Sequence, residues 1–425
     1  MTSAVFACVL ATAQGPLQGQ ALLDDLSQRA VQFFVNESHP ATGFTKDRAS
    51  NFGTDNFTVA SVASTGFALS AYAIGAERGW ISRATALTKT RNTVFALRNL
   101  AARHRGWYYH FIDWQTGVRV WNSEVSSIDT AILLAGMIAA DEYFDDPTLR
   151  GQVKGIISEI DWQWMLTDGG ARPNELNIGH GWRPETGFIS NRWDNYSEQL
   201  ILMLQMLGAW NACPTGVWTS PVRQRHTYSN IEFLTGGPLF IHQMSQGFVD
   251  FDKRRDRLGY DYWVATRRAT MANRRYCINN PRGFTGYGAQ FWGLTASDGP
   301  DGYAAFGAPV WGDDNGTVAP TTVAASIEFL TAECQLTLNS MRTQHANAYG
   351  RYGFSNAINP SRNWVGPDVI GIDLGMAMCA IENFRDGFIH KQSEKSPIIQ
   401  RGLRRAGFTT GRVPSAQTNV LYSPR

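Results

Sequence analysis

Six stretches of the chain are apolar on almost every side of a helical projection, and each of them follows a polar loop. A helix that lacks a polar face has to be buried. Between these stretches lies a second set in which Lys, Arg or Glu marks one side only, as in amphipathic helices. The apolar stretches begin near Thr58, Ser126, Asp194, Pro238, Thr322 and Asp368, and the amphipathic ones cover 22–36, 82–103, 147–166, 260–278, 331–345 and 394–405.

The alternation of the two sets predicts an all-α fold, a toroidal (α/α)6 barrel with six inner helices inside an outer layer. The third outer helix, expected near 220–234, and the boundary of the fifth pair, near 331, have the weakest patterns. No linker rich in Pro, Ser or Gly divides the chain. The pattern therefore predicts one domain over residues 20–410, followed by a C-terminal tail at 411–425.

Long loops precede several of the predicted inner helices. In such a ring the inner helices run in one direction, so their N-termini and the preceding loops meet at one rim. Loops of this length in a compact domain are usually functional. The loops are 104–125, 167–193, 279–321 and 346–367, and they hold much of the Trp, Tyr, Gly and Asp. We therefore expect an aromatic-lined cleft at this rim.

Composition narrows the choice of partner. The 425 residues include 38 basic and 36 acidic side chains, so the net charge of +2 provides no overall field for nucleic acid. Aromatic residues make up 12% of the chain, with 14 Trp, 14 Tyr and 23 Phe, many of them beside charged residues and Gly. Flat rings next to hydrogen-bonding groups suit sugars. The predicted partner is an oligo- or polysaccharide, bound by a monomer.

The first residues have some features of a secretion signal. A short apolar run at 4–11 is followed by Ala11-Thr12-Ala13, which has the small-x-small form of a signal-peptidase site, although no Lys or Arg precedes the run. The run is too short to span a bilayer. These features predict a signal peptide at 1–19 and a periplasmic or secreted protein without a membrane span. The cysteines after Cys8 are too far apart for a CxxC motif, and disulfides stay open.

Three acidic residues stand near the starts of predicted inner helices. Asp129 lies in a near-match to a capping box, and Asp373 interrupts an apolar stretch. Glu198, expected in the first turn of its helix between aromatic and apolar neighbours, suits a general acid because such surroundings raise the pKa of a carboxyl. Each also has a structural explanation. Asp129 and Glu198 would interact favourably with the dipole of their helix, and Asp373 would form an ion pair with Arg385 or Arg362.

Other chemistries lack their motifs. The eight histidines show neither HExxH nor any pair at i and i+4, which disfavours a catalytic metal. No Gly-x-Ser-x-Gly elbow and no Gly-x-Gly-x-x-Gly at the start of a helix is present. We therefore expect chemistry by carboxylates, with no metal and no organic cofactor. A structural calcium among the loop residues Asp298, Asp301, Asp313 and Asp314 is the one alternative.

Ordered motifs along most of the chain resemble the bacterial glycoamylase-like domain. They are 123–131 (SEVSSIDTA), 161–165 (DWQWM), 181–188 (GWRPETGF), 192–198 (RWDNYSE), 237–240 (GPLF), 292–300 (WGLTASDGP) and 371–373 (GID). The combination of 181–188 with 292–300 is the most specific part. This family includes the endo-β-1,2-glucanases of glycoside hydrolase family 144, which have an (α/α)6 fold and invert the anomeric centre. The resemblance thus implies hydrolysis of a glucan, with β-1,2-glucan as the leading substrate.

The resemblance also implies roles for single residues. Glu198 falls where the family has a carboxylate proposed as the acid, Asp129 falls in its acidic cleft motif, and Asp373 is the loosest match, to the second carboxylate. Glu198 would protonate the glycosidic oxygen while Asp373 or Asp129 activates a water, with the two carboxyl groups roughly 6.5–9.5 Å apart. The other residues expected to contact the substrate are Glu124, His180, Trp182, Arg183, Glu185, Arg192, Trp193, Asp194, Tyr287, Trp292 and Asp298.

Two other classes of function stay open. A non-catalytic glycan-binding protein needs the aromatic residues but no opposed carboxylates, and a transglycosylase or phosphorylase could use the same barrel. The linkage, the chain length and the choice between endo and exo action are likewise open.

Overall fold

The structure of the protein, a computed structural model, describes residues 16–410 and is predominantly helical. This confirms the predicted class. The apolar run at 4–11, the cleavage-site pattern after it and the tail at 411–425 lie outside the described residues. The longer helices are α1 Gly19–Asn36, α2 Val62–Glu77, α3 Arg83–Asn99, α4 Ser127–Phe144, α5 Pro147–Ser158, α7 Leu200–Ala209, α10 Tyr262–Asn279, α12 Thr331–Gln344, α13 Gly371–Asp386 and α15 Pro397–Ala406. The shorter ones are α6 Trp162–Leu166, α8 Gly216–Thr219, α9 Phe240–Gln243, α11 Pro320–Ala324 and α14 Phe388–Ser393.

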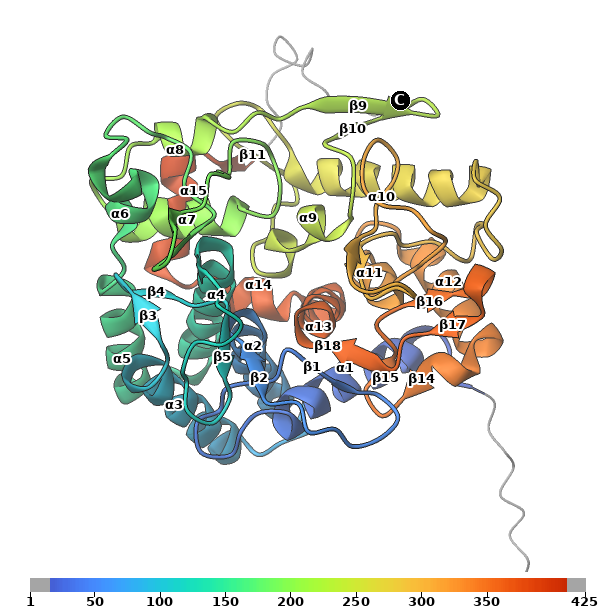
Figure 1. Ribbon diagram of the computed structural model, residues 1–425, viewed down its shortest axis with the longest axis horizontal. Coiled ribbons are helices and arrows are strands. Elements are labelled where there is room, and N and C mark those ends of the chain that lie inside the picture. The colour runs from blue at the N-terminus through green and yellow to red at the C-terminus, as the bar shows by residue number, and fades with distance from the viewer. Residues whose placement is uncertain (1–15, 411–425) are drawn as a thin grey trace, which may run out of the picture.

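The helices form an inner and an outer set. Helices α2, α4 and α13 are buried over almost their whole length, as all-round apolar sequences require. Helix α2 packs against both α4 and α13, while α1, α3, α5, α10 and α12 lie farther out (Figure 1). Glycines allow α2 and α4 to approach closely. A methyl group on Gly136 would come within 1.8 Å of the carbonyl oxygen of Gly66.

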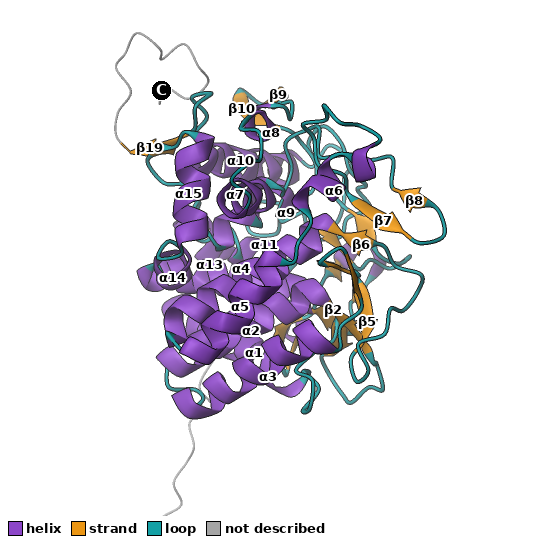
Figure 2. Ribbon diagram, turned by 90° about the vertical axis from the view of Figure 1, so that its left-hand side faces the viewer, coloured by secondary structure: helices purple, strands orange, loops and turns teal. Residues whose placement is uncertain are grey.

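Short strands gather on one side of the helical body (Figure 2). They were not predicted, because pairs of two or three residues leave no alternating pattern in the sequence. The strands that shape this side are β1 Arg48–Ser50 with β18 Asp368–Ile370, β2 Val59–Ser61 with β5 Phe111–Asp113, and the sheet of β6 Val125–Ser126, β7 Gly181–Arg183 and β8 Gly187–Phe188. The remaining strands are β3 Arg103–His104, β4 Trp107–Tyr108, β9 Arg225–Tyr228, β10 Ile231–Leu234, β11 Arg254–Arg255, β12 Ala296–Ser297, β13 Ala304–Ala305, β14 Tyr349–Gly350, β15 Gly353–Phe354, β16 Ile358–Asn359, β17 Trp364–Val365 and β19 Thr409–Thr410.

Several predicted helices are shorter than expected. The stretch from Pro238 forms only α9 and the 3₁₀ turn η2 Ser245–Gly247, and the stretch from Thr322 forms only α11. The outer helix expected over 147–166 is divided into α5 and α6. Burial explains the first two errors, since an apolar segment enclosed on all sides needs no regular helical period. The remaining 3₁₀ turns are η1 Asp168–Gly170, η3 Ala346–Ala348 and η4 Pro360–Arg362.

The prediction of an outer helix near 220–234 is wrong. Strands β9 and β10 form an antiparallel hairpin there, with Tyr228 opposite Ile231. The two turn residues, Ser229 and Asn230, have φ angles of 46° and 65°. Two successive left-handed residues form the type I′ turn that matches the twist of a hairpin. The Ser-Asn pair, flanked by Thr227 and Tyr228 on one side and Ile231 on the other, was the sequence feature that indicated this hairpin.

The structure also shows the state of four cysteines and the character of the helices with respect to a membrane. Cys213, Cys277, Cys334 and Cys379 are buried and carry free thiols. Between residues 16 and 410, no helix is long and apolar enough to cross a membrane.

Candidate active site

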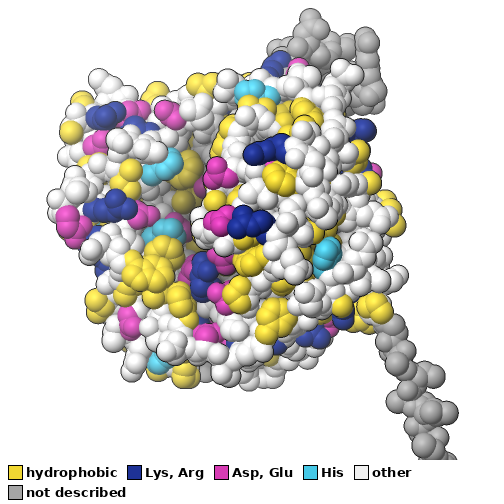
Figure 3. All heavy atoms as spheres, turned by 45° about the vertical axis from the view of Figure 1, so that its right-hand side comes forward, with side chains coloured by type: hydrophobic (Ala, Val, Ile, Leu, Met, Phe, Trp, Pro, Cys, Tyr) yellow, Lys and Arg dark blue, Asp and Glu magenta, His cyan; other side chains and the backbone are white. Residues whose placement is uncertain are grey.

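A cavity of about 420 Å³ is lined by residues of the short strands β1, β2, β5 and β18 and of neighbouring segments. Its wall comes from segments far apart in the chain: Asp47, Arg48, Ser61, His110, Phe111, Trp121, Ile128, Asp129, Ile132, Glu198, Phe240, Met244, Tyr303, Ile370 and Ile372. Loops 104–125 and 279–321 both contribute, as predicted, whereas loops 167–193 and 346–367 contribute no residue to the wall. Figure 3 shows acidic and basic side chains along a hollow in the molecular surface. The cavity therefore combines apolar walls with paired charges.

The N-terminus of α4 fixes Asp129 in this wall. Ser126 is the N-cap residue, and its hydroxyl oxygen accepts a hydrogen bond from the Asp129 amide at 3.2 Å. The same hydroxyl donates to Asp129 Oδ2 at 2.6 Å. The capping pattern in the sequence thus predicted the local structure correctly. It did not indicate that the carboxylate would also face a cavity.

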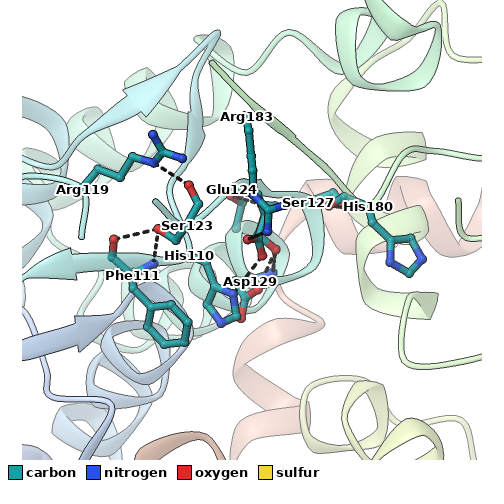
Figure 4. A network of polar contacts seen from close by, with 11 residues as sticks. His110, Phe111, Arg119, Ser123, Glu124, Ser127, Asp129, His180 and Arg183 are labelled. Carbon is teal, nitrogen blue, oxygen red and sulfur yellow. Dashed lines mark hydrogen bonds and ion pairs between the residues drawn. The ribbon is translucent and has the colours of Figure 1, made fainter. Parts of the chain in front are cut away.

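His110 links Asp129 to a second carboxylate (Figure 4). Its Nδ1 lies 3.0 Å from Glu124 Oε1, and its Nε2 lies 3.5 Å from Asp129 Oδ1. Burial lowers the pKa of the imidazole, but the charges of Asp129, Glu124 and Asp47 outweigh burial and raise that pKa to about 9. At neutral pH the ring is therefore a cation with both N–H groups available to donate.

The groups around Glu124 stabilise its ionised form. The hydrogen bond from His110 is the main reason that the pKa of Glu124 is lowered to about 2. Arg183 Nη2, 3.3 Å from Glu124 Oε2, acts in the same direction. Strand β7 brings Arg183 there, because Trp182 pairs with Val125 next to Glu124. Figure 4 shows Arg183 extending toward Glu124, while the ring of His180 lies away from this network.

Glu198 has the opposite electrostatic setting. Burial raises the pKa of its carboxyl, the Ser197 hydroxyl partly offsets this by donating to Oε2, and the negative charge of Asp129 raises it further. The prediction that Glu198 lies in the first turn of its helix is wrong, because α7 begins at Leu200. The turn is held by Ser245, whose hydroxyl donates to the Glu198 carbonyl at 2.7 Å and accepts from the Ile201 amide at 3.0 Å.

Asp373 lies on α13 beside the cavity wall, with Ile370 and Ile372 of the same segment in the wall itself. Asn356 Nδ2 donates to its Oδ2 at 2.6 Å. Burial is the main cause that raises the pKa of Asp373 to about 7, and the negative charges of Asp298 and Asp47 add to it. The predicted ion pair with an arginine is not formed, since Arg385 pairs with Asp24 and Arg362 with Asp301.

Arg48 balances the acidic groups next to Asp373. Its Nη1 lies 3.0 Å from Asp298 Oδ2, and its Nε lies 3.3 Å from Asp47 Oδ2. Strand β1 places Arg48 opposite Ile370, and the Gly371 amide donates to the Asp47 carbonyl at 2.7 Å. Asp298, predicted to contact the substrate, thus holds a cavity arginine in place.

The structure does not bring Trp292, Tyr287 or Trp193 into the cavity wall. Trp292 is fully buried and its indole N–H donates to Thr337 Oγ1 at 2.8 Å. Tyr287 donates to Asp314 Oδ1 at 2.7 Å. Trp193 is 6% exposed, stacks on His180 with ring centroids 3.8 Å apart and donates to Ser127 Oγ at 2.9 Å. Trp193 and Trp292 were expected to contact the substrate, but both rings belong to the packed interior.

The other predicted substrate contacts have partners within the protein. Trp182 stacks on His104 with centroids 4.2 Å apart, and Glu185 pairs with Arg119 at 2.6 Å. Arg192, whose side chain is 7% exposed, binds Asp168 at 2.7 Å. Asp194 is exposed and accepts a hydrogen bond from Asn195 at 2.9 Å, outside the cavity wall.

Sequence reasoning missed Asp47, Arg48, His110, Trp121 and Tyr303, which all line the cavity. The loop before the first inner helix, at 37–57, was not among those expected to form the cleft. Its Lys-Asp-Arg run was a readable signal of charge in a loop. Asp298, Asp301 and Asp314 have protein partners, and no group of His, Cys, Asp and Glu able to hold a metal ion occurs among residues 16–410.

Comparison with known proteins bears on the site. Residues 190–397, which include Glu198 and Asp373, match the Glycoamylase family, described as putative glucoamylase. The chain resembles this family over that stretch. A solved putative glucoamylase from Bacteroides fragilis is 26% identical to this chain, with a TM-score of 0.84 over 94% of it and 100% of the relative. An endo-β-1,2-glucanase from Chitinophaga pinensis, solved with sophorotriose and glucose, is 24% identical and shares the fold, with a TM-score of 0.85 over 93% and 99% of the two chains.

A curated relative of the chain is named for its activity. It is an exo β-1,2-glucooligosaccharide sophorohydrolase (non-reducing end) from Parabacteroides distasonis, 26% identical over 92% of this chain. The chain spans 58% of the length of that relative.

Proposed function

We propose that the protein is a glycoside hydrolase that cleaves β-1,2-glucan with inversion of the anomeric centre. The observation that carries the proposal is the cavity, in which a carboxyl with a raised pKa, Glu198, shares a wall with the charged pair of His110 and Asp129. The names of the sophorohydrolase and the endo-β-1,2-glucanase support the choice of linkage.

Glu198 takes the role of the general acid. Its raised pKa favours the protonated form of the carboxyl, and its place in the wall lets it reach a glycosidic oxygen, directly or through a hydroxyl of the substrate. Donation of this proton neutralises the charge that develops on the leaving oxygen as the bond breaks.

Asp373 takes the role of the base. Both oxygens of Asp129 are engaged, by Ser126 and by the His110 cation, whereas Asp373 has one hydrogen bond and a pKa of about 7. A carboxylate with that pKa accepts a proton from water more readily than an ordinary aspartate. Its charge interactions with Asp47, Arg48 and Tyr303, which all line the cavity, support this role. Asp129 then binds substrate hydroxyls and supports the protonated state of Glu198.

We also propose that the helices form an (α/α)6 barrel. The inner helices α2, α4, α7 and α13, together with the short segments α9 and α11, are the six inner members of an (α/α)6 barrel, and the helices outside them form its outer layer. The short α9 and its C-cap bring Phe240 and Met244 to the cavity, and the loop between β12 and β13 brings Tyr303.

We also propose that the protein works as a monomer in the periplasm or outside the cell. The support is the apolar run at 4–11 with its small-x-small end, together with the size of a polysaccharide substrate. Fractionation of expressing cells tests the location, since activity confined to the cytoplasm contradicts it. Light scattering of the purified protein tests the monomer.

The test of function is release of reducing sugar from β-1,2-glucan, compared with β-1,3-, β-1,4- and α-1,4-glucans in phosphate-free buffer. The proposal expects release from the β-1,2-linked chain alone. Binding without release indicates a glycan-binding protein. Release that requires added phosphate indicates a phosphorylase, and longer products without net reducing sugar indicate a transglycosylase.

A further inference from the structure

Two large exposed aromatic side chains lie in the cavity wall, and neither was predicted to bind sugar. Trp121 is 60% exposed and so is Tyr303, whereas Trp193 and Trp292, which were expected to contact the substrate, are buried. Exposure of a large ring leaves apolar surface in contact with water, so such a ring in a cavity marks a surface that another molecule covers.

The backbone at Trp121 is unusual. Trp121 and Asn122 have φ angles of 56° and 49°, both in the left-handed region. Asparagine adopts this region readily, but a bulky side chain is disfavoured there. Strained positions of this kind cluster at ligand-binding sites, where the surrounding structure holds them. The strain at Trp121 therefore gives the ring a direction that an ordinary turn would not provide.

The turn that carries Trp121 is fixed on both sides. The Val120 amide donates to the Phe111 carbonyl at 3.1 Å, and the Ser123 amide donates to the Val120 carbonyl at 3.1 Å. The Ser123 hydroxyl donates to the Phe111 carbonyl at 3.1 Å (Figure 4). Because β5 holds the turn at these points, the indole is presented without a large loss of side-chain freedom on binding.

Other rings support the indole from the protein side. Phe111 meets it edge-on with centroids 5.1 Å apart, and Phe57 does so at 6.1 Å. Phe111 in turn stacks on the His110 ring at 3.8 Å. A continuous row of rings thus runs from the charged pair of His110 and Asp129 out to Trp121. A sugar chain that reaches the charged groups would meet the indole next.

We propose that Trp121 is the stacking platform for a glucosyl unit of the substrate beyond the bond that is cleaved, so that it favours long chains over short ones. The apolar face of a pyranose ring fits the exposed indole, and its hydroxyl groups reach water at the edge. The inference rests on the proposed function, because it assumes that a glucan occupies the cavity.

The experiment compares wild type, Trp121→Ala and Trp121→Phe on β-1,2-glucans of graded length. Phe95→Ala is the matched control, since Phe95 is 56% exposed but lies on the outer helix α3. For long chains we expect Trp121→Ala to raise KM about ten-fold, which corresponds to ~1.4 kcal/mol of lost binding. The turnover number should change little, since stacking away from the reacting bond stabilises ground state and transition state alike. Trp121→Phe should restore most of the affinity.

The outcomes separate this inference from the proposed function. Equal KM values for wild type and Trp121→Ala at every chain length overturn the inference, as does a loss confined to the turnover number. Calorimetry on Glu198→Gln and on Glu198→Gln with Trp121→Ala measures binding without hydrolysis, and the second protein should bind long glucan more weakly. If wild type releases no sugar and Glu198→Gln binds no β-1,2-glucan, the proposed function itself fails.

Discussion

The imidazole of His110 stands 3.0 Å from the carboxylate of Glu124, on the wall of the cavity that holds the proposed acid. The pair is charged at neutral pH, because the pKa of Glu124 is lowered to about 2 and that of His110 is raised to about 9. Glu124 thereby fixes the cation that faces Asp129. This arrangement makes the stability of the fold depend on pH in a defined direction.

The first prediction concerns this pH dependence. A folded-state pKa of about 9 lies above the value of about 6.5 for an unfolded histidine, so the contribution of His110 is complete below pH 6.5 and is lost as the pH rises through 9. The melting temperature of wild type should therefore fall between pH 6.5 and 9.5, and His110→Gln should show a smaller fall. The same slope in both proteins would show that His110 is neutral in the fold.

Replacement of the proposed acid should abolish most activity without unfolding the protein. We expect Glu198→Gln to lower the turnover number by a factor of ~10²–10⁴, the usual loss when a general acid is removed. Glu77→Gln, at the exposed end of α2, is the control and should retain full activity. Circular dichroism checks the fold. Near-normal turnover in folded Glu198→Gln would remove Glu198 from the mechanism.

Substitution of Asp373 should distinguish a catalytic base from a carboxylate with a purely structural role. Its folded pKa of about 7 lies above the unfolded value of about 3.9, so the native state favours the neutral form and loses stability as the pH rises through 7. Asp373→Asn should therefore melt no lower than wild type at pH 8, yet have lost most of its turnover. In wild type, kcat/KM should fall as the pH drops below 7. An active Asp373→Asn with a lowered melting temperature would indicate a purely structural role.

Trp292 should contribute to stability and not to binding. Its ring is fully buried and its N–H is bonded to Thr337, so Trp292→Ala should destabilise the protein by about 3–5 kcal/mol in urea unfolding. The KM of the remaining folded protein should stay within about two-fold of wild type, because a core ring makes no contact with a substrate. A raised KM without destabilisation would indicate that Trp292 contacts the substrate.

The sequence allowed prediction of the elements that local physics determines. All-round apolar stretches gave α2, α4 and α13 because burial on every side leaves that pattern, and Ser126 before Asp129 gave the start of α4 because capping acts within one turn. Glu198, which lines the cavity, and Asp373, which lies beside it, were singled out because a carboxylate next to an apolar run is unusual.

The remainder depends on contacts between distant segments. Arg48 reaches the cavity because β1 pairs with β18, more than 300 residues later, and no single sequence shows that pairing. The sequence did not single out His110 for the same reason, since Glu124 and Asp129 approach it only after β5 and α4 have packed. Trp292 was predicted to contact the substrate and Trp121 was not, because composition does not distinguish a buried ring from an exposed one.

The central claim is that this cavity hydrolyses β-1,2-glucan with inversion, and proton NMR during the reaction tests it most directly. The spectrum follows the loss of β-1,2 linkages and the anomeric form of each new reducing end in one experiment. We predict that the α anomer appears first and that the β anomer grows in later by mutarotation. A spectrum without new reducing ends would contradict hydrolysis of this linkage, and a β anomer that appears first would contradict the inverting mechanism.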